Sequence, residues 1–263
     1  MGQQHPSYIL PGLWQGGSNL NDDPEFFRQN GITHILTTGG TRPTQEVLDA
    51  IDCTPERHLD FPASDIPTQN LRMYMAEAAE FLIRARLSGG VVFVHCFYGV
   101  SRSSTLTIAS LSILLELPIT EIYNHLTRNR EATKFYWNTA FWSQLKDWEK
   151  SKDRKELMKK LKADESLKDA WDSVRRSDLQ YMNQVQLELE QEYEENPGFF
   201  GACIGGRRIS KRDLAADPNA VCAPPNLGNP GASGIDVSPG MRANLSENDH
   251  QQPVFPPLAY TQS

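Results

Sequence analysis

Apolar and polar positions along residues 8 to 150 follow the alternating pattern of a compact α/β domain. Strands are predicted at YILPGLWQGG, which glycines interrupt, at ITHILTTGG and at the weaker RHLDFPA. The continuously apolar VVFVH is typical of a strand that is covered on both faces. Helices are predicted at DDPEFFRQNG, TQNLRMYMAEAAEFLIRARLSGG, SSTLTIASLSILLEL, ITEIYNHLTRNR and KFYWNTAFWSQLKDWE.

Residues 151–196 differ sharply in composition, because they are dense in charge and nearly lack glycine and proline. The segment is predicted to be a charged helical extension. One interpretation is a solvated extension that packs on its own domain through a weak apolar stripe of Leu157, Leu161 and Trp171. The alternative is a coiled-coil or partner-binding helix, although the apolar residues do not sustain a heptad.

Residues 197–263 are rich in Gly, Pro, Asn and Ser and poor in large apolar side chains, so this tail is predicted to be disordered. Two short features stand out in it: RRIS presents Ser210 behind two arginines, and PVFPPLAY suits polyproline geometry. Each is either a chance match or a site for modification or a partner. Partner contacts through the 151–196 helix or the Pro-rich tail are therefore hypotheses.

Composition narrows the class of protein. The 263 residues are 39% apolar and 22% charged, with a net charge of −7. This acidic balance argues against a general binder of nucleic acid or membrane surfaces. Because no membrane span or secretory signal stands out, a soluble protein of the cytoplasm or nucleus is expected. The four scattered cysteines predict neither a disulfide scaffold nor a metal site.

A cysteine at the end of the buried strand leads through a short loop into an apolar helix. The strand should end at His95, the loop should run from Cys96 to Ser101, and the helix should begin near Arg102. Unpaired N–H groups and the helix dipole at such a junction bind anions, and Gly99 allows the tight curvature. The spacing predicts a tetrahedral oxyanion site with Cys96 at its floor, the Arg102 guanidinium on its rim, and backbone contacts from Phe97, Tyr98, Gly99, Val100 and Ser101.

The same surroundings predict the chemistry of the two ends of this loop. A helix N-terminus and a nearby arginine favour the thiolate form of a cysteine, so Cys96 is predicted to be a nucleophile at neutral pH. The planar fork of Arg102 matches two phosphoryl oxygens, an orientation that a lysine would not reproduce. The site is therefore suited to phosphoryl transfer from an ester.

Transfer from an ester to a thiolate also needs a proton donor for the departing oxygen. FPASDIPTQNL supplies Asp65 between a strand and a helix start, whereas Asp60 lies inside the strand-like run. From local sequence alone, Asp65 is either this acid or a turn residue. Ser103 is either a hydrogen-bond donor to the Cys96 thiolate or an ordinary first-turn serine. His95 either orients the cysteine from beneath the loop or is a satisfied core histidine.

HCFYGVSRS fits the HCxxGxxRS signature of the cysteine-based dual specificity protein phosphatases, and the chain resembles an atypical, small member of that family. ILPGLWQGG and GITHIL are similar to the family's opening segments. WNTAFWSQLKDWE is similar to its closing PNxGFxxQLxxWE, with matches at Asn138, Phe141, Gln144 and Leu145. Asp65 lies 31 positions before Cys96, where the family carries its general acid.

The resemblance covers residues 8 to 150 and implies a catalytic domain in 1–150 with a central, twisted, mostly parallel sheet flanked by helices. It also implies catalysis by Cys96, Arg102, Asp65 and Ser103, with His95 and Asn138 behind them, without a metal or organic cofactor. Trp137 replaces the family's usual proline and Ala140 its glycine, which leaves the local packing of the closing motif open.

The expected substrate is a phosphoprotein, hydrolysed at phosphotyrosine and at phosphoserine or phosphothreonine. The loop lacks the lysines that lipid-phosphate members of the superfamily tend to carry, which favours a protein over a phosphoinositide. Two alternatives stay open. One is a phosphoprotein-binding scaffold with little turnover, and the other is a phosphatase of a non-protein substrate such as an RNA 5′ end or a carbohydrate phosphate.

Overall fold

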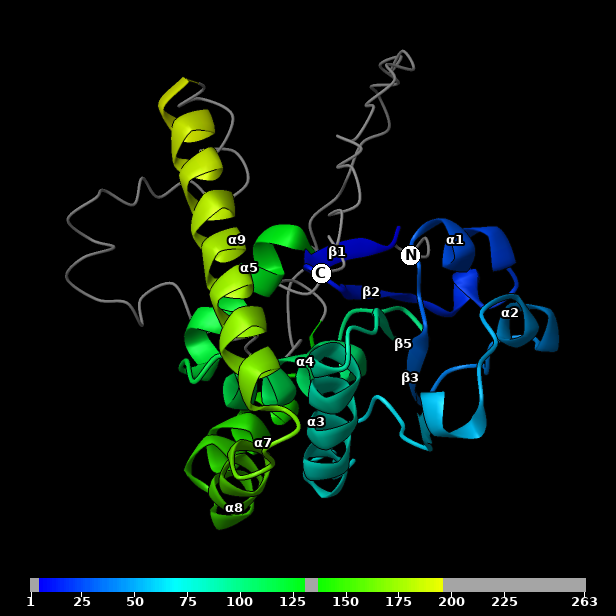
Figure 1. The fold of residues 1–263 in the computed structure, drawn as a ribbon, viewed down its shortest axis with the longest axis horizontal. Helices are drawn as coiled ribbons and strands as arrows, with labels where there is room; N and C mark the ends of the chain where they lie inside the picture. Colours follow the sequence, from blue (N-terminus) through cyan, green and yellow to red (C-terminus); the bar gives the residue numbers. More distant parts are fainter. Residues whose placement is uncertain (1–4, 131–136, 196–263) are drawn as a thin grey trace, which may run out of the picture. The chain divides into compact units, whose positions relative to one another are not determined.

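The computed structural model describes residues 5–130 and 137–195. Its strands are β1 (Ser7–Leu10), β2 (Leu13–Gly17), β3 (His34–Thr38), β4 (His58–Phe61) and β5 (Val92–Cys96). They form one five-stranded sheet in the order β1-β2-β5-β3-β4 (Figure 1). Strand β1 is antiparallel to β2, and every other neighbouring pair is parallel. The mostly parallel sheet implied by the resemblance is confirmed.

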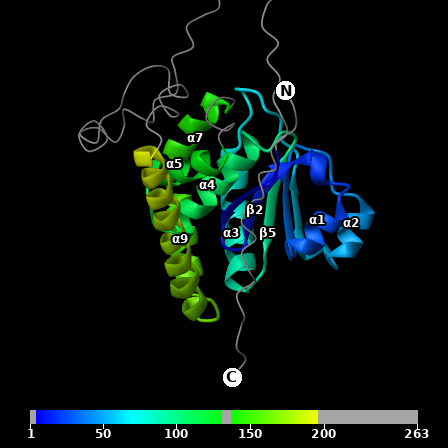
Figure 2. The ribbon, with the colours of Figure 1, turned by 90° about the horizontal axis from the view of Figure 1, so that it is seen from above.

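Helices cover both faces of this sheet. They are α1 (Pro24–Gln29), α2 (Gln45–Ala50), α3 (Arg72–Leu87), α4 (Arg102–Leu114), α5 (Ile119–Asn129), α7 (Thr139–Lys150), α8 (Lys152–Lys162) and α9 (Lys168–Glu195). Helices α1 and α2 lie on one side of the strands, and α3, α4 and the later helices lie on the other (Figure 2). None of the described helices combines the length and the apolar composition needed to cross a membrane.

The pleat of the central strand explains its unbroken run of apolar residues. Val92 and Val94 of β5 belong to the large core beneath α3 and α4. Phe93 points to the other face, where it packs with Phe27 of α1 and Val47 of α2. Because successive side chains of a strand alternate between faces, a strand covered on both sides needs apolar residues throughout.

Two elements differ from the sequence prediction. YILPGLWQGG forms a hairpin of two strands instead of one interrupted strand, because Pro11 lacks an N–H and Gly12 adopts a φ of 76° at the turn. Helix α2 was not predicted. It has six residues, with a Thr44 side chain that caps Val47, and is too short to display a helical period.

The charged helices α8 and α9 pack on the domain that precedes them. Leu157, Leu161 and Trp171 are buried in the large core, as the apolar stripe indicated. Asp178 of α9 is fully buried and accepts two hydrogen bonds from Arg86 of α3, each 2.7 Å long. The stretch 151–195 therefore shares a core with the sheet.

Several predictions concern residues outside the described ranges. These are the disorder predicted for residues 197–263, the possible modification of Ser210 and the polyproline geometry of PVFPPLAY. The first residues of the helix predicted at KFYWNTAFWSQLKDWE also lie outside them, and the described helix α7 begins at Thr139.

Candidate active site

The strand, loop and helix predicted around the cysteine are present. Cys96 is the last residue of β5, and α4 begins at Arg102. Gly99 has a φ of 70°, and a Cβ at this position would overlap the backbone of Gly16 in β2. The loop therefore requires glycine both for its curvature and for its close approach to the neighbouring strand.

The sulfur of Cys96 lies at the bottom of this loop and is almost fully buried. The Gly99 N–H donates a hydrogen bond to Sγ at 3.2 Å. The Ser103 hydroxyl, in the first turn of α4, lies 3.4 Å from the same atom. The sulfur therefore lies within reach of a backbone N–H and a hydroxyl where the loop enters α4.

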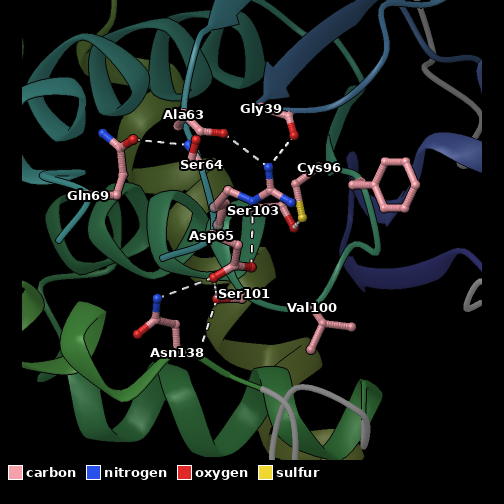
Figure 3. Close-up of polar contacts among 12 residues, drawn as sticks. Gly39, Ala63, Ser64, Asp65, Gln69, Cys96, Val100, Ser101, Ser103 and Asn138 are labelled. Carbon is pink, nitrogen blue, oxygen red and sulfur yellow. Dashed lines mark hydrogen bonds and ion pairs between the residues drawn. The ribbon is translucent and has the colours of Figure 1, made fainter. Parts of the chain in front are cut away.

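The Arg102 side chain is buried and held by carbonyl groups from two other loops. Its Nη1 donates to the Gly39 carbonyl after β3 and to the Ala63 carbonyl, at 3.0 Å, after β4. In Figure 3 dashed lines from these two labelled carbonyls meet at one nitrogen. Its Nε has no hydrogen-bond partner among the described residues. One edge of the guanidinium is thus fixed to the scaffold, and its Nε faces the Asp65 carboxylate at 3.5 Å.

Asp65 reaches this group from the loop between β4 and α3. Its Oδ2 lies 3.5 Å from Arg102 Nε, and its Oδ1 accepts hydrogen bonds from Ser101 Oγ at 3.0 Å and Asn138 Nδ2 at 3.3 Å (Figure 3). Asp60 instead pairs with Arg42 at 2.6 Å on β4. Of these two carboxylates, the structure brings Asp65 to Ser101 and Arg102 at the end of the loop that follows Cys96.

The closing motif supports the loop that carries Asp65. The Asn138 N–H donates to Ser101 Oγ at 3.1 Å, which fixes the hydroxyl that holds Asp65. Gln144 accepts a hydrogen bond from the Leu71 N–H at 2.7 Å and so caps the start of α3.

Trp137, where the family usually has proline, stacks on Tyr123 and donates to Thr105 Oγ1 at 2.9 Å. The substitution is accommodated by packing against α4 and α5.

His95 lies beneath the loop and is completely buried. Burial lowers its pKa from 6.5 to about 3, so the imidazole is neutral at physiological pH. Its Nε2 is 2.8 Å from Thr37 Oγ1, and the same hydroxyl is 3.0 Å from His58 Nε2. An imidazole with so low a pKa is a weak base, so His95 suits an orienting role better than that of a general base.

The two aromatic residues of the loop point outward. Phe97 and Tyr98 are 41% and 43% exposed, and their rings meet edge to face. Val100 and Ser101 are buried. Phe97 borders a pocket at the carboxyl ends of the parallel strands, where α/β folds commonly bind ligands; its lining residues are Gly39, Pro62, Ala63, Ser64, Asp65, Phe97 and Arg102.

Arg130 is a second buried cation near the nucleophile, and sequence reasoning missed it. Its Nη1 donates to the His5 carbonyl, the Ser7 hydroxyl and the Gln15 carbonyl at 2.9 to 3.0 Å. Burial lowers its pKa to about 10, and the charge of Cys96 opposes that shift, so the guanidinium stays protonated at neutral pH. An arginine near the end of an amphipathic helix carries no signal of burial in the sequence.

Comparisons with known proteins agree with this site. The family described as "Dual specificity phosphatase, catalytic domain" matches residues 13–151. Mouse dual specificity protein phosphatase 22 is 33% identical over 144 residues, covering 55% of this chain and 73% of that protein. Human dual specificity protein phosphatase 16 is 31% identical over 146 residues, covering 55% of this chain but only 21% of that protein.

A solved structure supports the same assignment. The crystal structure of DUSP15 superposes with a TM-score of 0.51 and 26% identity, covering 59% of this chain and 95% of that one. With the signature loop, the fold and the family match over residues 13–151 in agreement, the chain belongs to the dual specificity phosphatase family.

Proposed function

We propose that this chain hydrolyses phosphotyrosine and phosphoserine or phosphothreonine in proteins through a cysteinyl-phosphate intermediate. The observation that carries the proposal is the arrangement around one sulfur. Cys96 Sγ accepts a hydrogen bond from the Gly99 N–H of the loop that leads into α4. Asp65 and Arg102 face each other at 3.5 Å in the adjoining pocket. The nucleophile and the anion site thus come from one segment, residues 96–102, and the acid comes from the loop between β4 and α3.

In the first step, the Cys96 thiolate attacks phosphorus and forms an S–P bond as the ester P–O bond breaks. The electron pair of that bond stays on the leaving oxygen, which takes a proton from the Asp65 carboxylic acid. Loop N–H groups and Arg102 hold the non-bridging oxygens, where charge develops in the transition state. The products of this step are the dephosphorylated residue and cysteinyl-phosphate.

In the second step, water attacks phosphorus and the S–P bond breaks. Asp65, now a carboxylate, accepts a proton from the water, and the thiolate departs from phosphorus. The Ser103 hydroxyl, 3.4 Å from Sγ, is suited to donate to the departing thiolate and make it a better leaving group. Inorganic phosphate is released, and Cys96 and Asp65 return to their starting protonation states.

The first test replaces the nucleophile. Cys96→Ser should abolish turnover of a chromogenic aryl phosphate while keeping affinity for vanadate, because the loop N–H groups remain. Cys53→Ser is the matched control, since Cys53 lies after α2 and is not among the residues that line the pocket. Sizeable turnover by Cys96→Ser would show that another group is the nucleophile.

The second test examines the acid. Asp65→Asn keeps a side chain that Ser101 and Asn138 can contact but cannot supply a proton. Its turnover should fall most on phosphopeptides, whose leaving oxygens need protonation, and least on aryl phosphates with acidic leaving groups. An equal loss on both kinds of substrate would point to a structural role for Asp65.

The rival functions are separated by substrate. Phosphotyrosine and phosphothreonine peptides, a phosphoinositide, a triphosphorylated RNA end and a carbohydrate phosphate should be offered at equal concentration to the full chain. The proposal expects the phosphopeptides to be hydrolysed fastest. Binding of phosphopeptides without release of phosphate would instead support a scaffold.

A further inference from the structure

A glutamine is buried in the sheet directly beneath the loop of residues 96–101. Gln15 stands in the middle of β2, pairs with Val94 of β5, and is 0% exposed. Burying a side-chain amide is unfavourable unless the amide is hydrogen-bonded. The partners of this amide therefore matter, and they lie in the loop and in the helix that follows it.

Gln15 holds two successive loop carbonyls, one directly and one through a serine. Its Nε2 donates to the Gly99 carbonyl at 3.0 Å and to Ser104 Oγ at 2.8 Å. Ser104 Oγ in turn donates to the Val100 carbonyl at 2.7 Å. Both carbonyls are thereby fixed toward the outside of the loop, against β2 and α4.

Fixing a carbonyl also fixes the next N–H group. Every peptide bond among the described residues is trans, so the C=O and N–H of one peptide unit point in opposite directions. Holding the Gly99 and Val100 carbonyls outward turns the N–H groups of Val100 and Ser101 toward the inside of the loop.

A third carbonyl, at the start of the loop, is also held by hydrogen bonds from outside it. The Ser18 N–H and hydroxyl both donate to the Phe97 carbonyl at 3.1 Å, which turns the Tyr98 N–H away from β2. The Gly99 N–H already points inward, to Cys96 Sγ. The loop therefore presents its donors to the sulfur side because its acceptors are held from the opposite side.

We infer that Gln15 is a positioning residue, which orients the loop N–H groups toward the phosphoryl oxygens without touching the substrate itself. This inference rests on the proposed function, since it assigns Gln15 a part in the same site. Arg130 contributes to the arrangement from below, because its Nη1 donates to the main-chain carbonyl of Gln15 at 3.0 Å.

The test compares buried polar residues that do and do not hold the loop. Gln15→Met keeps the length of the side chain and removes both donors, and Ser104→Ala removes the tie to Val100. Ser110→Ala is the matched control, because Ser110 is also buried in α4 but donates to Leu106 within its own helix at 2.7 Å. Urea unfolding of each variant first establishes that it is folded.

Two readouts distinguish positioning from simple stabilisation. The first is the Kd of inorganic phosphate, measured by calorimetry, and the second is kcat/KM on an aryl phosphate. Gln15→Met and Ser104→Ala should each weaken phosphate and lower kcat/KM by about tenfold, the effect of one well-oriented hydrogen bond. Ser110→Ala should change both by less than twofold while losing comparable stability.

The outcomes bear separately on the two proposals. If folded Gln15→Met and Ser104→Ala bind phosphate as tightly as the wild type, the inference about Gln15 is wrong. If Gln15→Met does not fold, Ser104→Ala against Ser110→Ala still decides the matter. A wild-type chain that binds phosphate but hydrolyses no ester contradicts the proposed function and leaves the phosphate comparison valid.

Discussion

The buried ion pair between Arg86 of α3 and Asp178 of α9 leads to a quantitative prediction about stability. The two side chains are 2% and 0% exposed and share two hydrogen bonds of 2.7 Å. Asp178→Ala would leave a buried guanidinium whose remaining hydrogen bond goes to the Pro11 carbonyl. Removing one partner of a buried pair lowers the free energy of unfolding by about 3–5 kcal/mol, against about 5–15 kcal/mol for a whole domain.

A double variant separates the loss of the pair from the loss of one charge. Burial raises the pKa of Asp178 although Arg86 donates two hydrogen bonds to it, so desolvation outweighs the attraction between the partners. Arg86→Met combined with Asp178→Leu removes both charges and retains apolar volume. Its unfolding free energy should lie within about 1 kcal/mol of the wild type, well above that of Asp178→Ala.

Urea unfolding followed by circular dichroism measures both effects. The control is Asp153→Ala, which breaks the ion pair of Asp153 with Arg72, whose side chains are 62% and 37% exposed. Exposed pairs contribute at most about 1 kcal/mol, so the control should stay near the wild type. If Asp178→Ala is no less stable than this control, or if the double variant is as unstable as Asp178→Ala, the reasoning about burial is refuted.

Two further predictions concern the residues around the sulfur. The folded-state pKa of His95, about 3, lies below its ordinary 6.5, so between these values the unfolded chain binds a proton that the folded chain does not. Stability should therefore be full above pH 6.5 and fall toward pH 3 by up to about 1.4 kcal/mol per unit. His95→Gln should show a shallower fall in urea unfolding between pH 6.5 and 4.5, and parallel slopes would count against the burial of the imidazole. Separately, inorganic phosphate should slow the alkylation of Cys96, as followed by peptide mass spectrometry. It should leave the alkylation of Cys53 unaffected, because Cys53 lies outside the anion site. Burial raises the pKa of the Cys53 thiol, so Cys53 should react slowly with or without phosphate. Equal protection of both cysteines would mean that phosphate does not bind above Cys96.

The core of the fold was predictable because its information is local. The unbroken apolar run around Val94 predicted a strand covered on both faces, and the spacing from Cys96 to Arg102 predicted the loop and the helix start. The hairpin at Gly12 was missed because a two-residue turn barely interrupts an apolar pattern. The resemblance to the family was needed to identify Asp65 as the candidate acid, since a role in a turn explained this residue equally well from local sequence.

The supports of the site could not be read from the sequence, because they join segments that are distant along the chain. Gln15 and Gly99 are separated by 84 positions, and Arg102 and Ala63 by 39. A glutamine between a tryptophan and a glycine suggests the polar face of a strand, and only the neighbouring β5 and α4 show that it is buried. The sequence signal, a polar residue inside an apolar strand, is visible but ambiguous.

Substrates can be captured with an inactive variant of the chain. The two carbonyls that hold Arg102 decide which residue should be replaced to make it. Replacing Arg102 would deprive the Gly39 and Ala63 carbonyls of their donor, and both groups lie in segments that shape the pocket. The resulting protein would lose chemistry and geometry together, so weak capture would carry no information about its partners. Cys96→Ser changes a single atom and leaves those segments tied, which makes it the appropriate bait.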